Sequence, residues 1–257
     1  MSKKSSSGIS KRKQRNTQSN VAGTAATSQQ AAQGDMIRGV SQVQIDQLRG
    51  TRDHQSAGSI DWRTIQQDYK RVGITITDDE ARDIHTSIKH FSFGYDTAMR
   101  KARALQQLGR EHDLTSEQKE YLRQYALCEE YCRVAPIYPS TKQSMIYRGI
   151  KFSTITPDYS AGIVALKVGD KWNADGMPSS YSTDLKVAKS FSHHAGQKGI
   201  IMHMPTKGLK NSPSIRGISS FPSENEVFVA DYNWKVAKIS DQRQQGDGYY
   251  HIYLEHA

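Results

Sequence analysis

The sequence predicts an α+β protein, in which a helical first part is followed by a run of short strands. Two capping boxes introduce stretches of helical period between residues 60 and 135. After Pro139 the chain consists of short runs rich in β-branched and aromatic residues, separated by turn residues. A polar segment of low complexity precedes both parts, and we find no internal repeat.

The composition of the 257 residues fits one sizeable domain with a polar appendage. The hydrophobic fraction of 36% is low for a wholly globular chain, and a long polar segment explains it. The net charge of +9 favours negatively charged partners, such as nucleic acid, nucleotide phosphates, acidic proteins or an anionic membrane face. No apolar run reaches the ~18 residues that a membrane span requires. The polar run Ser5–Gly8 stands where a signal peptide needs an apolar core, so we expect a cytoplasmic protein. Secretion as an effector and packaging in a virion are the alternatives.

Residues 1–58 are predicted to form a disordered basic tail. Lysines and arginines occur here with no acidic residue before Asp35, and no aromatic residue precedes Trp62. Such a segment cannot bury enough apolar surface to offset its chain entropy. It is interpreted as a solubilising tail, with contact to RNA, DNA or an acidic partner as the alternative. The folded domain is expected to span residues 59–257.

Helices are expected from residue 60 to residue 135. The capping box Thr77–Glu80 introduces a stretch in which Ile84 and Ile88 recur on one helical face. A second box, Thr115–Gln118, introduces a helix that ends near Pro136.

Cys128 and Cys132 are the only cysteines and lie four residues apart in this second helix. No second Cys or His pair at ligand spacing accompanies them, so a zinc site is not expected. A helical pair at this spacing is also awkward for a disulfide, and two reduced thiols are expected.

The part after residue 140 is expected to be rich in strands, interrupted by one helix for which Asp184 is a plausible N-cap. The expected strands are Met145–Ile150, Gly162–Val168, Gly199–Met204, Glu226–Tyr232, Trp234–Ile239 and Tyr249–Leu254.

The first motif with chemical content is Arg148, which lies inside an apolar strand and precedes Gly149. A buried guanidinium needs an anionic partner, and it can bind two phosphate oxygens at once. The glycine would let a ligand approach the backbone closely. Taken alone, this motif is better explained by an arginine on an edge strand that faces solvent.

The second motif is the hydroxyl-rich run Ser179–Thr183, which leads into the helix after Asp184. Its hydroxyls can orient a carboxylate or a sugar hydroxyl, or they can simply cap the helix. The third motif is Glu224-Asn225-Glu226, at the entrance to an apolar strand. Strand alternation would place both carboxylates on one side, where their repulsion raises one pKa and lets them act as base and charge stabiliser. Two solvated glutamates are the alternative.

In this order and spacing, the three motifs resemble the R-S-E class of mono-ADP-ribosyltransferases, which includes clostridial-type toxins, phage enzymes and vertebrate ecto-enzymes. The resemblance covers about residues 75–257. It implies two packed, mainly antiparallel β-sheets that form a cleft for NAD, the co-substrate, and it implies no metal. The helix Asp83–Arg100, with Tyr95 and Arg100, resembles the helix that covers this cleft in the toxin branch.

The resemblance also assigns roles to the residues that bind and cleave NAD. Arg148 would contact an NAD phosphate and support the cleft, and Gly149 would bond to the nicotinamide carboxamide through its backbone. Glu226 would be the catalytic glutamate, which bonds to the 2'-hydroxyl of the nicotinamide ribose, and Ser182 would hold Glu226 in position. Phe191 would lie near the nicotinamide.

On the acceptor side, Glu224 would engage the acceptor and Phe221 would lie on the recognition loop before it. The family's central motif is commonly Ser-Thr-Ser, whereas this chain has Ser182, Thr183 and Asp184. Asp184 either caps the helix or weakens NAD binding through its charge.

The acceptor favoured by the resemblance is a protein arginine, because Glu-x-Glu is the form found in the arginine-modifying members. The positive charge of the chain keeps RNA or DNA open as an alternative acceptor. An NAD glycohydrolase and an inactive NAD-binding module are further alternatives. An enzyme able to harm its own cell would need a neutralising partner, such as an antitoxin or immunity protein, and a phage, defence-system or effector setting fits the sequence equally well.

Overall fold

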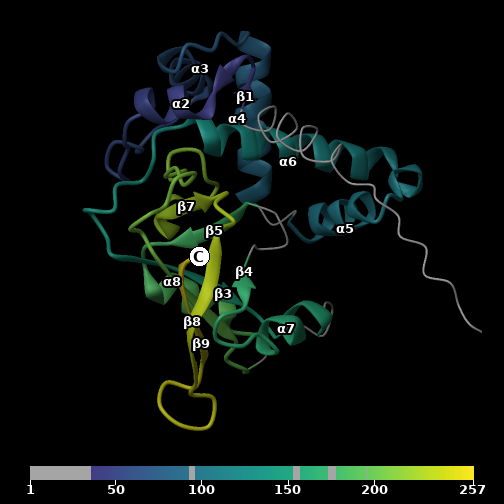
Figure 1. The fold of residues 1–257 in the computed structure, drawn as a ribbon, viewed down its shortest axis with the longest axis vertical. Helices are drawn as coiled ribbons and strands as arrows, with labels where there is room; N and C mark the ends of the chain where they lie inside the picture. The colour runs from purple at the N-terminus through teal and green to yellow at the C-terminus, as the bar shows by residue number, and fades with distance from the viewer. Residues whose placement is uncertain (1–35, 93–95, 153–156, 173–177, 195) are drawn as a thin grey trace, which may run out of the picture. The chain divides into compact units, whose positions relative to one another are not determined.

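The computed structural model describes residues 36–257 with the exception of 93–95, 153–156, 173–177 and 195. Residues 37–257 form one compact unit, in which a mainly helical part precedes a part rich in strands, so the predicted α+β class is confirmed (Figure 1). The elements before the main sheet are the short strand pair β1 (Met36–Ile37) and β2 (Val40–Ser41), then α2 (Gln42–Leu48), α3 (Trp62–Arg71), α4 (Asp78–Ser92), α5 (Asp96–Gln107), η1 (Glu111–Asp113) and α6 (Ser116–Val134).

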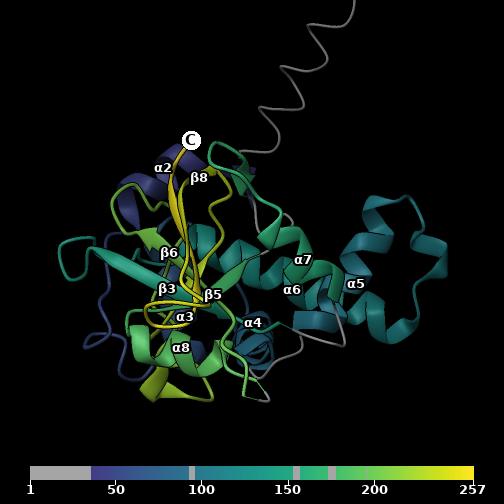
Figure 2. The same cartoon turned by 90° about the horizontal axis from the view of Figure 1, so that it is seen from below.

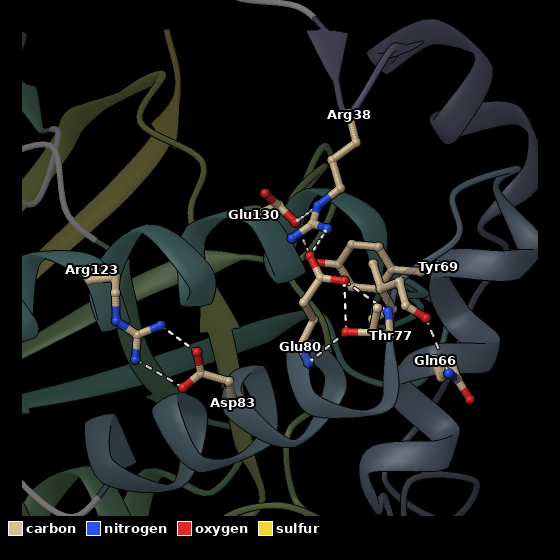
Figure 3. Close-up of polar contacts among 9 residues, drawn as sticks. Arg38, Gln66, Tyr69, Thr77, Glu80, Asp83, Arg123 and Glu130 are labelled. Carbon is tan, nitrogen blue, oxygen red and sulfur yellow. Dashed lines mark hydrogen bonds and ion pairs between the residues drawn. The ribbon is translucent and has the colours of Figure 1, made fainter.

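Both predicted capping boxes are present. Glu80 N donates to Thr77 Oγ1 at 3.2 Å, and Thr77 N donates to the Glu80 carboxylate at 2.8 Å (Figure 3). At α6, Gln118 N donates to Thr115 Oγ1 at 3.1 Å, and Thr115 N donates to the Gln118 side chain at 2.9 Å. Local sequence therefore sets where α4 and α6 begin.

Charged side chains connect the helices to one another and to the chain before them. The Arg38 guanidinium contacts Glu80 at 2.6 Å and Glu130 at 2.8 Å, and the Tyr69 hydroxyl donates to Glu130 at 2.8 Å (Figure 3). These contacts bring together α3, α4 and α6 around the loop between β1 and β2.

The predicted boundary at residue 58 is wrong, because residues 37–58 belong to the compact unit. Ile45 of α2 and Ala57 are fully buried in the helical core, and Arg49 is only 1% exposed. The composition of this segment is polar, but its apolar side chains Ile45 and Ala57 are buried against the helices. Residues 1–35 lie outside the described residues, so the prediction of a basic tail stays a prediction for them.

A buried ion pair fixes this segment to the helices. The Asp68 carboxylate is fully buried and accepts two bonds from the Arg52 guanidinium, at 2.9 and 2.5 Å, and one from the Tyr131 hydroxyl at 3.0 Å. Removing one partner of such a pair leaves an unpaired buried charge, so Asp68→Ala is expected to cost about 3–5 kcal/mol of the free energy of unfolding. Chemical denaturation measures this loss.

The control for this prediction is Asp241→Ala. Asp241 forms an exposed ion pair with Arg243, and such pairs contribute about 0–1 kcal/mol. Equal losses of free energy in the two variants would contradict the role given to Asp68.

In the described residues after 140, the chain forms the strands of the main sheet, two further α-helices and a short 3-10 helix. These elements are β3 (Met145–Ile150), α7 (Pro157–Val164), β4 (Lys171–Trp172), β5 (Ser179–Ser182), α8 (Leu185–Ser192), β6 (Ile200–Pro205), η3 (Pro222–Glu224), β7 (Glu226–Val229), β8 (Trp234–Asp241) and β9 (Tyr250–His256). The expected strand at 162–168 is wrong: α7 occupies its first residues. A short apolar run does not distinguish strand from helix, and Pro157 suits the first turn of a helix.

The strands form one mixed seven-stranded sheet in the order β4-β8-β9-β6-β3-β5-β7, where the resemblance implies two separate sheets. β3 pairs with β6 along its whole length but with β5 only at Tyr147 and Ser182, so a single register pair joins the antiparallel β5–β7 pair to the rest of the sheet. The two faces of the sheet pack into different hydrophobic cores. Phe228 packs with the helices, whereas Val227 and Val229 pack in the core of the opposite face.

Two smaller expectations concern single elements. Cys128 and Cys132 are buried as free thiols, and burial raises the pKa of both.

Asp184 caps α8 by accepting from Lys186 N at 2.8 Å, which gives it the first of its two expected roles. Among the described residues, no helix is both long and apolar enough to cross a membrane.

Candidate active site

Glu226 is the buried carboxylate of the third motif. It is the first residue of β7, it is 5% exposed, and it lies directly opposite Ser182 in the β5–β7 pair. Burial raises its pKa, while the side chains of Ser180 and Ser219 and the positive charge of Arg148 act in the opposite direction. The carboxylate is thus held in a poorly solvated place by hydroxyl groups and one cation.

One oxygen of this carboxylate is unsatisfied. Glu226 Oε2 is buried and has no hydrogen-bond partner among the described residues. A buried polar atom without a partner costs free energy, and most such atoms in proteins are paired. The site therefore suits a ligand that donates a hydrogen bond to this oxygen, such as a sugar hydroxyl.

Ser182 bonds to the chain just before Glu226 and not to its carboxylate. Its hydroxyl donates to the main-chain oxygen of Glu224 at 2.6 Å and accepts from Asp184 N at 2.9 Å. Ser182 thus holds the chain that leads into β7, and Ser180 and Ser219 supply the hydroxyls for Glu226.

Glu224 lies near Glu226 for a different reason than predicted. It ends the 3-10 turn η3, and Asn225 follows in the left-handed conformation with φ 48° and ψ 55°, so strand alternation does not apply here. Asparagine tolerates this conformation better than most residues. Partial burial and the neighbouring charge of Glu226 raise the pKa of Glu224 to about 7. The two carboxylates do interact, as the third motif predicts.

Gly149 is required by α8. A Cβ atom at this position would lie 1.8 Å from the main-chain oxygen of Ala188, so the helix backbone occupies the space that the glycine leaves. Figure 2 shows α8 beside β3. The interpretation that the missing side chain admits a ligand is therefore wrong on this side of the strand. A bond from the Gly149 backbone to nicotinamide stays a prediction.

Arg148 is partly buried on β3 between the buried residues Ile146 and Ile150. Its charge lowers the pKa of Glu226, so the structure brings the first and third motifs together. A contact with an NAD phosphate stays a prediction.

Two aromatic residues named by the resemblance are exposed. Phe191 on α8 is 45% exposed, and Phe221, directly before η3, is 42% exposed. The Phe221 backbone N–H donates to Ser219 Oγ at 3.1 Å, so the loop that carries Phe221 and the Glu226 carboxylate share one serine. Tyr95 lies outside the described residues, and so does the side chain of Arg100.

Sequence reasoning missed Ser219 and His54. Ser219 lies in a loop with no regular period, and no local signal connects it with Glu226. His54 falls in the segment assigned to the tail, but its ring bonds to Thr183 Oγ1 at 3.2 Å. Ser180 lies inside the second motif, and strand alternation from Ser182 could have identified it.

Comparison with known proteins gives the fold. No protein-family model matches the sequence, and no curated protein matches it. The structure of Vis, an ADP-ribosyltransferase toxin from Vibrio splendidus, solved with the inhibitor M6, superposes with a TM-score of 0.51 at 18% identity, over 81% of this chain and 87% of that one. An ADP-ribosyltransferase from Clostridium botulinum gives 0.48 at 16% identity, over 73% and 90%. The likeness to Vis shows that the chain has an ADP-ribosyltransferase fold.

Proposed function

We propose that this chain is a mono-ADP-ribosyltransferase, which cleaves the bond between nicotinamide and ribose in NAD and passes ADP-ribose to an acceptor. The observation that supports this most directly is the buried Glu226 carboxylate, whose Oε2 atom lacks a partner among the described residues of an ADP-ribosyltransferase fold. The 2'-hydroxyl of the nicotinamide ribose would donate to this oxygen. The guanidinium of Arg148 would face a phosphate of the same molecule.

Cleavage develops positive charge on the ribose as nicotinamide leaves. A fixed carboxylate in a poorly solvated site stabilises such charge, and one contact of this kind typically contributes about 3 kcal/mol to lowering the barrier. Arg148 and the hydroxyls of Ser180 and Ser219 favour the ionised form of Glu226 that this role requires. These residues thus oppose the effect of burial, which favours the neutral form of the group.

The acceptor we favour is a protein arginine. A guanidinium is a poor nucleophile while it is protonated, so it needs a carboxylate that orients it and takes its proton. Glu224 is suited to this because its pKa of about 7 makes it an effective base near neutral pH. The exposed ring of Phe221 directly precedes the 3-10 turn that ends at Glu224 and would contact the acceptor protein.

A test of the function uses the full chain, NAD labelled on the adenosine, and agmatine as a small guanidine acceptor. We expect release of nicotinamide and labelled agmatine. In cell lysate, label removed by protease indicates a protein acceptor, and label removed by nuclease indicates a nucleic acid. Nicotinamide release without any labelled acceptor would show an NAD glycohydrolase, and no release would contradict the proposed function.

Glu224→Gln is expected to separate transfer from cleavage. In the wild type, the ratio of labelled agmatine to released nicotinamide should rise with pH through about pH 7, because only the ionised carboxylate accepts the proton. The variant should keep nicotinamide release within about threefold and lose at least tenfold in transfer, with a ratio that no longer depends on pH. Ionisation of Glu226 affects cleavage and transfer alike, so dividing labelled agmatine by released nicotinamide removes its contribution. A pH-dependent ratio in the variant would contradict the role of Glu224.

A further inference from the structure

His54 connects two loops that are distant from it in sequence and that flank the start of β7. Its Nδ1 atom lies 2.7 Å from Ser214 Oγ, and its Nε2 atom lies 3.2 Å from Thr183 Oγ1. The ring also packs on Tyr138, with 4.7 Å between the ring centroids. The imidazole is therefore fixed at both nitrogens and on one face.

Each hydroxyl bonded to His54 belongs to a segment that contacts the chain around Glu226. Ser214 forms an isolated bridge with Val227, and the next residue, Ile215, donates its N–H to the Glu226 main-chain oxygen at 3.1 Å. Thr183 donates its N–H to the Asn225 main-chain oxygen at 3.3 Å. His54 thus holds one segment on each side of the Glu-x-Glu motif.

The backbone that carries His54 is itself fixed to the loop that supplies Ser219. The Arg216 guanidinium donates to the His54 main-chain oxygen at 3.5 Å. A Cβ atom at Gly217 would lie 2.1 Å from the Ala57 main-chain oxygen, so the two segments are in direct backbone contact. A shift of this segment would therefore move the loop that bonds to Glu226.

The protonation state of His54 suits these two hydrogen bonds. Burial, followed by the charge of Arg216, lowers its pKa to about 4, and Asp53 opposes the shift. The ring is then neutral near pH 7, with one nitrogen that donates and one that accepts. Two hydroxyl groups can satisfy both, because a hydroxyl donates as well as accepts.

We infer that His54 is a positioning residue for the Glu226 carboxylate, acting through Ser214 and Thr183. The inference rests on the proposed function, since it assigns Glu226 to the reaction. It gives residues 51–60 a role in the active site, although they lie far from every motif in the sequence. A misplaced carboxylate stabilises developing charge poorly, so the expected defect lies in the chemical step and not in NAD binding.

The test compares His54→Ala, His54→Asn and His54→Gln with the wild type. Alanine removes both bonds, asparagine can replace Nδ1 and keep the shorter bond to Ser214, and glutamine can replace Nε2 and keep the bond to Thr183. We expect His54→Ala to lower kcat for nicotinamide release ten- to a hundredfold and to change KM for NAD less than threefold. His54→Asn should recover at least half of the loss on a logarithmic scale.

The control is Tyr69→Phe, which removes a buried hydroxyl bonded to Glu130 in the helical part. It should destabilise the fold without lowering kcat. If Tyr69→Phe lowers kcat as much as His54→Ala, or if asparagine and glutamine both fail to recover activity, the positioning role is wrong.

Amide hydrogen exchange gives a readout that does not depend on activity. In His54→Ala, amides of residues 179–186 and 212–228 should exchange at least tenfold faster than in the wild type, and Tyr69→Phe should leave them unchanged. If the wild type releases no nicotinamide, the proposed function fails, and exchange still decides whether His54 holds these segments. If the wild type is active and His54→Ala keeps its kcat, only the role of His54 is overturned.

Discussion

Glu226→Gln is expected to reduce nicotinamide release and ADP-ribosyl transfer at least a hundredfold. Glutamine keeps the shape of the side chain and removes the negative charge that, on the proposed function, would face the developing oxocarbenium. A loss of one such electrostatic contact, about 3 kcal/mol, corresponds to a factor of more than a hundred in rate. Release of labelled nicotinamide under saturating NAD measures this directly.

The same substitution should not weaken the fold. Burial raises the pKa of Glu226, so the folded state disfavours the ionised carboxylate, and ionisation removes stability as pH rises above the ordinary range of a glutamate. Near pH 7 a neutral amide at this position should leave the melting temperature equal or higher. The control is Glu255→Gln, a half-exposed glutamate paired with Lys235, which should change neither rate nor stability. Activity of Glu226→Gln within a few-fold of the wild type would contradict the catalytic assignment.

The parts of the fold and site that could be predicted depend on short stretches of sequence. The capping boxes at Thr77 and Thr115 satisfy backbone donors within four residues, so they determine the helix starts wherever the helices pack. Glu224 and Glu226 are two residues apart, and the effect of the Glu226 charge on the pKa of Glu224 follows from that closeness in sequence. The left-handed conformation of Asn225 breaks the strand alternation between them, but the two residues remain close.

The parts that could not be predicted depend on contacts between distant residues. Residues 37–58 carry few apolar side chains, and only the helical core shows that Ile45 and Ala57 are buried. The bond between His54 and Ser214 joins residues 160 positions apart, with no period or motif in either segment. The interpretation of Gly149 failed for a similar reason, because the sequence showed that something approaches the backbone and did not show that it is α8.

Gly149→Ala is expected to destabilise the fold by about 3 kcal/mol or more, the upper end of the range for overpacking. The added Cβ would meet the Ala188 oxygen at 1.8 Å and Ser192 N at 2.8 Å, and all of these neighbours are backbone atoms that cannot rotate away. For a domain of this size the loss corresponds to a fall in melting temperature of roughly 6–12 °C. The control is Gly162→Ala on α7, where a Cβ meets nothing within 4 Å and where alanine favours the helix.

The activity of Gly149→Ala should fall further than its stability explains, because α8 starts directly after the second motif. Asp184 caps the helix and its N–H donates to Ser182 Oγ at 2.9 Å, so a displaced α8 moves the hydroxyl that holds the Glu224 carbonyl. Nicotinamide release measured well below the melting temperature of the variant separates the two effects. A variant that is destabilised but fully active at that temperature would show that α8 adjusts without moving Ser182, and the coupling between helix and carboxylates would be wrong.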